Sequence, residues 1–100
     1  AGKLSANLLS MNSKVLVFWA EIAGLRPKDF ISIRFFGPDG VLLAEKEETM
    51  TKHQIRKSWW IGKKSNDSWS PGAYRGEIII SRETRTGPMV SRRKARLDVF

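Results

Sequence analysis

Residues 70–80, with the sequence SPGAYRGEIII, constrain the fold more than any other part of this 100-residue chain. Pro71 presets φ at about −65° and suits the second position of a turn, after which Gly72 can adopt a positive φ. Beyond the turn, apolar residues recur at every second position, which is the period of a β-strand. A tyrosine at the start of such a strand, here Tyr74, is typical of the tyrosine corner of β-sandwiches, in which the phenol bonds back to the upstream backbone. The stretch therefore predicts a late strand of a two-sheet sandwich.

The other strand candidates are short segments rich in Val, Ile, Phe and Trp, separated by turn signals of which GPDG at residues 37–40 is the strongest. We expect strands at residues 4–11, 14–24, 30–36, 41–45, 53–61 and 89–100. Residues 45–52 are expected to cross between sheets, and residues 62–68 to form a polar loop. The chain is thus predicted to be all-β, an antiparallel two-sheet β-sandwich of about seven strands. An up-and-down barrel is the rival architecture.

The apolar pattern also predicts which side chains enter the core. Trp19 is expected there as a structural residue, and Ile55, Trp59 and Ile61 are expected to anchor their strand. Trp59 and Trp60 are adjacent, so in a strand they must point to opposite faces. The pattern leaves open which of these two rings is exposed.

The charge is concentrated in the second half of the chain. The net charge is +8, yet residues 1–50 hold six Lys and Arg against six Asp and Glu, whereas residues 51–100 hold twelve against four. On the last strand, alternation places Arg92, Lys94 and Arg96 on one face, spaced by roughly 7 Å. Such a strip would attract nucleic acid, anionic lipid or acidic wall polymers, and it equally serves to protect an edge strand from aggregation. Neighbouring strands are expected to extend it with Arg56, Arg75 and Arg82.

Aromatic residues near these cations suggest a binding surface. An exposed Trp60 beside the two lysines that follow it, with Trp69 at the end of the polar loop, could stack on sugar rings or bases. The alternative is that Trp60 packs beneath the stems of Arg or Lys side chains on the outer sheet face. The candidate binding surface consists of Trp60, Lys63, Lys64, Trp69, Arg92, Lys94 and Arg96.

Catalytic and metal-binding patterns are missing from the sequence. There is no cysteine, and the single histidine, His53, has no partner at metal-ligand spacing. Neither a nucleophile elbow nor a Gly-rich phosphate loop occurs. We therefore expect no catalytic residue, no metal and no cofactor.

The organisation of the chain is predicted to be simple. No apolar run reaches the about 18 residues of a membrane-spanning helix, and the first residues lack the apolar core of a signal peptide. Residues 1–100 are expected to form a single domain, excised from a longer protein.

Two turn motifs carry a resemblance to a known family. They are GPDGVL at residues 37–42 and WSPGAYRGE at residues 69–77. With them the chain, from about Val15 to Val99, resembles bacterial immunoglobulin-like or fibronectin-III-like accessory domains. It is similar to the β-sandwich module that accompanies lysostaphin-type peptidoglycan metallopeptidases in some Gram-negative bacteria.

The resemblance implies an immunoglobulin-like or fibronectin-III-like Greek-key fold, a non-catalytic role and an envelope location, periplasmic or secreted. Those peptidases hold zinc on a His-x-His pair with a further His and an Asp. His53 belongs to no such pair, so no catalytic residue is carried over.

Three functions remain open on this evidence. The first is a module that binds or positions, with a neighbouring domain, a protein partner or an anionic cell-wall polymer as its partner. The second is a nucleic-acid-binding module that uses the same charges and aromatic rings. The third is a structural spacer whose charge only keeps it soluble.

Overall fold

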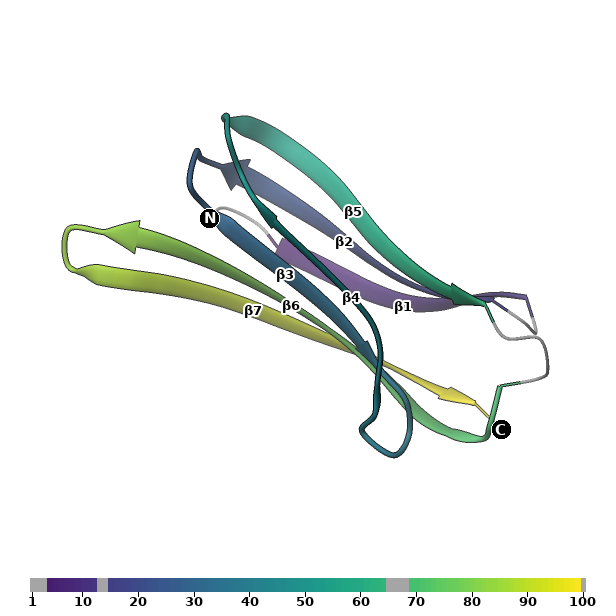
Figure 1. Cartoon of the computed structure of the whole chain (residues 1–100). Helices are drawn as coiled ribbons and strands as arrows, with labels where there is room; N and C mark the ends of the chain where they lie inside the picture. Colours follow the sequence, from purple (N-terminus) through teal and green to yellow (C-terminus); the bar gives the residue numbers. More distant parts are fainter. Residues whose placement is uncertain (1–3, 13–14, 65–68, 100) are drawn as a thin grey trace.

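The computed structural model describes residues 4–12, 15–64 and 69–99, which form seven strands in two antiparallel sheets (Figure 1). Sheet A contains, in spatial order, β1 (Leu4–Asn12), β2 (Val15–Leu25) and β5 (Gln54–Lys64). Sheet B contains β4 (Leu42–Thr49), β3 (Phe30–Phe36), β6 (Gly72–Thr84) and β7 (Gly87–Val99). The two layers pack face to face, with β1 against β7 and β5 against β4 at the margins. The predicted β-sandwich is confirmed, and the described residues contain no helix long and apolar enough to cross a membrane.

Alternate residues of the central strands fill the space between the sheets. On β2 and β6 the buried positions fall at every second residue, as the pleat of a strand requires. One inward position, Gly76 on β6, has no side chain, and a Cβ there would lie 2.3 Å from Cδ1 of Phe18. The ring of Phe18 therefore packs directly on the backbone of β6. The fully buried core includes Leu16, Phe18, Ile22, Leu25, Ile31, Ile33, Phe35, Ile78 and Ile80.

Two of the core predictions are wrong. Trp19 is half-buried on the outer face of sheet A, because the buried row of β2 consists of the residues on either side of it. Both faces of β2 are apolar, so the sequence pattern could not show which face is inward. Ile55 is 91% exposed. It lies opposite Gly24, whose φ of 73° breaks the alternation of β2, so no inward side chain of that strand covers it.

Two strands run further than their composition predicts. β4 continues through its charged segment to Thr49, so the crossing to sheet A occupies residues 50–53 and not 45–52. β5 continues to Lys64, which places Lys63 and Lys64 on a strand instead of in a loop. Both strands lie at sheet edges, where more positions face solvent and charged residues are tolerated. The rest of the predicted loop (65–68), together with Lys14 and Phe100, lies outside the described residues.

Candidate functional site

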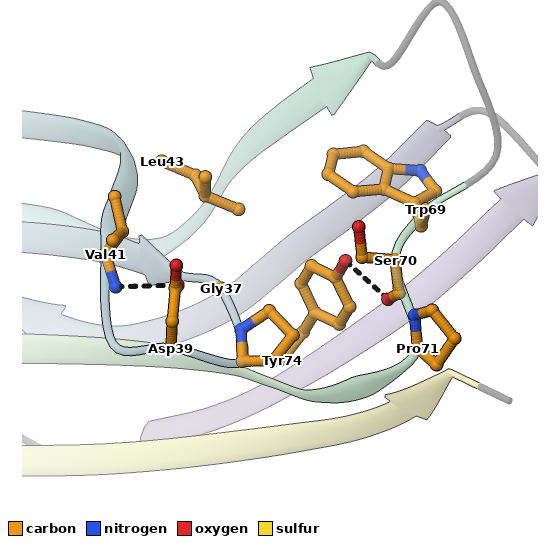
Figure 2. A pocket seen from close by; sticks show the side chains of 9 residues that line it. Gly37, Asp39, Val41, Leu43, Trp69, Ser70, Pro71 and Tyr74 are labelled. Atoms are coloured by element: carbon orange, nitrogen blue, oxygen red, sulfur yellow. Dashed lines mark hydrogen bonds between the residues drawn. The ribbon is translucent and has the colours of Figure 1, made fainter.

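The tyrosine corner forms as the sequence predicts. Tyr74 Oη donates a hydrogen bond of 2.8 Å to the carbonyl oxygen of Ser70 (Figure 2). Gly72 has a φ of 137°, and a Cβ on it would lie 2.6 Å from Cβ of Pro38. Only glycine therefore allows the β3–β4 turn to pack against the turn that precedes β6. Burial raises the pKa of Tyr74, and the negative charge of Asp39 adds to this effect.

A pocket of about 460 Å³ opens beside the corner, between the β3–β4 turn and the segment before β6 (Figure 2). Its aromatic side consists of Trp69 and Tyr74, whose ring centroids lie 5.5 Å apart at an interplanar angle of 82°. Val41 and Leu43 face them across the pocket. Asp39 contributes a carboxylate, and its Oδ1 accepts a 3.2 Å hydrogen bond from the backbone N–H of Val41. Trp69, predicted as a binding residue, is half-buried in this wall.

The outer face of sheet A carries a second feature, which we call the aromatic platform: Val17, Trp19, Trp60 and Gly62. Trp19 and Trp60 are direct partners in the register of β2 and β5, and Trp60 is 59% exposed. Cζ3 of Trp60 lies 3.7 Å from the position of a Cβ on Gly62. The indole of Trp60 therefore leans along β5 over the glycine and offers a broad apolar surface to solvent.

Among the described residues, no cation–π contact involves Trp19 or Trp60. Lys46 and Lys57 place their Nζ atoms 4.8 Å and 5.9 Å from the ring centroid of the buried Trp59, and the remaining cation–π contact joins Arg75 to Phe36. Two lysines thus lie over the ring of the buried Trp59. The alternative in which Trp60 packs beneath Arg or Lys stems stays a prediction.

Of the two predicted lysines, only Lys64 shares the face of the platform. Lys64 is opposite Val15 and follows Trp60 and Gly62 on the same face of β5. Lys63 is exposed on the alternate position of this edge strand. Toward the other end, Glu21 and Arg56 share the outer face, so the platform lies between charged groups of both signs.

The basic strip lies on the other side of the molecule. Arg92, Lys94 and Arg96 are exposed on the outer face of sheet B, as the alternation predicts. Lys94 Nζ lies 3.9 Å from a carboxylate oxygen of Glu77, and Arg96 Nε lies 2.9 Å from one of Asp98. The strip is therefore partly neutralised by its own sheet. Because the outer faces of sheet A and sheet B point away from each other, the strip and the platform cannot bind the same short ligand.

Arg82 does not extend the strip, because it forms an ion pair that the sequence analysis missed. Its Nε and Nη2 donate to the two carboxylate oxygens of Asp29 at 2.8 Å and 2.7 Å, and Nη2 also donates to the carbonyl oxygen of Gly24. Asp29 is 1% exposed and accepts a further bond from the backbone N–H of Arg26. The hydrogen bonds from Arg82 hold the pKa of Asp29 below its ordinary value, although burial opposes this.

One signal could have indicated the pair. Arg82 continues the inward row of β6 formed by Tyr74, Gly76, Ile78 and Ile80. An arginine in a buried row requires an anionic partner. Of the other two cations expected in the strip, Arg75 lies opposite Arg96 and does extend it, whereas Arg56 lies on sheet A.

Comparisons with protein-family models, with curated proteins and with solved structures give no match. Function must therefore be inferred from the surfaces of this chain. His53 is exposed just before β5, and among the described residues no group of three His, Asp or Glu side chains is placed to hold a metal ion. The predicted binding residues lie in three separate places: the aromatic platform with its lysines, the pocket at the tyrosine corner and the strip on β7.

Proposed function

We propose that this chain is a non-catalytic binding and positioning module whose aromatic platform holds a sugar polymer against the outer face of sheet A. The observation that carries the proposal is the exposed indole of Trp60 beside its cross-strand partner Trp19. Leaving a large aromatic surface in water is unfavourable, and contiguous apolar surface of this kind marks interaction sites. Sugar rings present apolar faces that stack on such a surface while their hydroxyls stay in water.

The charge beside the platform favours an acidic polymer. Lys64 lies at one end of it, Lys63 is the preceding residue of this edge strand, and the whole chain carries a net charge of +8. Cations of this kind attract carboxylate or phosphate groups at a range set by the ionic strength. An anionic cell-wall polymer supplies both the sugar faces and the negative charge.

The architecture supports a place for the module beside another domain. Three strands face four, and a tyrosine corner opens the sixth strand, as in immunoglobulin-like and fibronectin-III-like Greek-key domains. Under this proposal the chain is an accessory domain of an envelope protein, periplasmic or secreted, that holds a neighbouring catalytic domain such as a peptidoglycan peptidase near the wall. A nucleic-acid module is less well supported, because the basic strip and the platform lie on opposite faces.

Substitution of the platform tests the proposal. In titrations with soluble peptidoglycan fragments, Trp60→Ala should weaken binding roughly 5- to 150-fold, since a lost aromatic stack is worth about 1–3 kcal/mol. Lys63→Ala/Lys64→Ala should weaken binding more at low salt than at moderate salt. Arg92→Ala, on the far face, is the control and should bind as the parent chain does. Equal binding by the Trp60 variant and the parent would overturn the proposal.

A further inference from the structure

The pocket at the tyrosine corner is chemically unlike the rest of this basic chain. Asp39 is the one acidic residue of its lining, and no Lys, Arg or His is among the described residues that line it. Among the described residues no Lys or Arg forms an ion pair with this carboxylate. Its Oδ1 is held by the N–H of Val41, which orients the carboxylate on the β3–β4 turn. The pocket is therefore an acidic site on a chain of net charge +8.

The other walls are apolar and aromatic. Trp69 and Tyr74 meet edge to face on one side, and Leu43 with Val41 closes the other (Figure 2). Faces of aromatic rings attract cations as well as methylene groups. The negative field of Asp39 extends to the phenol, because it contributes to the raised pKa of Tyr74.

The rim of the pocket is also apolar. Val41, which lines the pocket, is one of the large exposed hydrophobic side chains of the described residues, at 54% exposure. A volume of about 460 Å³ falls within the range of small-molecule sites, and it exceeds what one unbranched side chain needs. An occupant that matches this lining has an aliphatic body and a cationic end.

We propose that this pocket binds a primary ammonium group carried on an aliphatic chain, as in a lysine side chain of a partner polypeptide. The ammonium group lies against the free edge of the Asp39 carboxylate, and the methylene groups lie between Leu43 and the rings of Trp69 and Tyr74. The site is separate from the aromatic platform and goes beyond the proposed sugar binding. The module would then have two ligands of opposite charge: an anionic polymer on the platform and a cationic side chain in this pocket at the end of the sandwich.

The test compares two probes that differ only in the ammonium group. Nα-acetyl-lysine-N-methylamide and Nα-acetyl-norleucine-N-methylamide are titrated into the full chain, and amide and indole shifts are followed by NMR. The lysine probe should produce saturable shifts in residues 37–43 and 69–74. The norleucine probe should bind about two- to fivefold more weakly, as expected for a partly exposed ion pair.

Two variants assign the effect to the carboxylate. Asp39→Asn keeps the acceptor oxygen for Val41 and removes only the charge, so it should abolish the preference for lysine over norleucine. Glu83→Gln removes the same charge at the far end of β6 and should leave the preference intact. Equal affinity of the parent chain for the two probes, or shifts that fall outside the pocket, would overturn the inference. Sugar binding on the platform can succeed or fail independently of this result.

Discussion

Gly76 determines how closely the two sheets approach each other at the centre of the sandwich. The ring of Phe18 occupies the space that a side chain on β6 would need, and its Cγ would lie 2.4 Å from an added Cβ. These ring atoms are near the backbone of β2, so the ring cannot rotate out of the way without moving the strand. The contact is a packing requirement that the sequence shows only as a glycine in a strand.

Replacement of this glycine should therefore cost stability. We expect Gly76→Ala to lower the free energy of unfolding by about 1–3 kcal/mol through overpacking. Gly62→Ala is the matched control, because a Cβ there meets its neighbours at 3.7 Å, an ordinary contact on the outer face. Urea denaturation of the two variants and the parent measures the difference. Equal stability of the two variants would show that the sheets separate easily.

At the scale of elements, the Asp29–Arg82 pair connects the turn before β3 to the end of β6. Asp29 is buried, and Arg82 holds both of its oxygens while also bonding the carbonyl oxygen of Gly24 at the end of β2. Three segments are thereby joined at the end of the sandwich opposite the tyrosine corner. One end of β6 is thus held by this ion pair, and the other end is held by the hydrogen bond of Tyr74 at the tyrosine corner.

Removal of one partner should leave the other charge buried without compensation. Asp29→Asn is expected to lower the free energy of unfolding by about 3–5 kcal/mol. A double variant, Asp29→Asn/Arg82→Met, removes both charges and should recover part of that loss. Thermal and urea unfolding measure both. The account of the pair would be contradicted if the double variant lost more free energy of unfolding than the two single variants lose together.

The same pair predicts a pH dependence. The pKa of Asp29 in the folded chain is lowered from the ordinary value of 3.8. The carboxylate therefore contributes stability that is present above the unfolded value and is lost as pH falls through the folded value. Unfolding free energies measured from pH 6 down to pH 2 should fall more steeply in the parent chain than in Asp29→Asn. Parallel curves for the two proteins would contradict the assignment.

The local pattern of the sequence was sufficient to predict most of the strands and the tyrosine corner. Period-two spacing and turn residues predict most strand positions, and Pro71-Gly72 followed by Tyr74 predicts the bond to Ser70, because all these signals act within a few residues. The misplacement of Trp19 has a different cause: β2 is apolar on both faces, and only the packing of sheet B decides which face is covered.

Contacts between distant residues could not be predicted in this way. The meeting of Trp19 with Trp60 depends on the register of β2 against β5, and the partner of Arg82 lies 53 residues earlier in the chain. The pocket likewise forms from two turns that are separate in sequence, which is why Trp69 was predicted as a binding residue but Asp39 was not. Each of these features follows from the packing of the sheets.

At the scale of the whole molecule, the binding features are separated by chemistry as well as by position. The sandwich measures 47 × 22 × 18 Å, and its long axis gives a polymer room to lie along one sheet. The platform faces outward from sheet A, the partly neutralised strip faces outward from sheet B, and the acidic pocket lies at the end near the tyrosine corner. Under the proposed function, an extended ligand lies on the outer face of sheet A, and the opposite face and the end stay free for a neighbouring domain.

An NMR shift map of the full chain tests the proposed function most directly. Peptidoglycan fragments and a single-stranded oligonucleotide are titrated in parallel, each at low and moderate salt. We predict saturable shifts with the fragments that are confined to the platform and to Lys63 and Lys64, with the outer face of sheet B unchanged. Shifts with the oligonucleotide alone, falling steeply with salt, would contradict the account in favour of nucleic-acid binding. No specific shift with either ligand would contradict it in favour of a structural spacer or a domain that binds only protein.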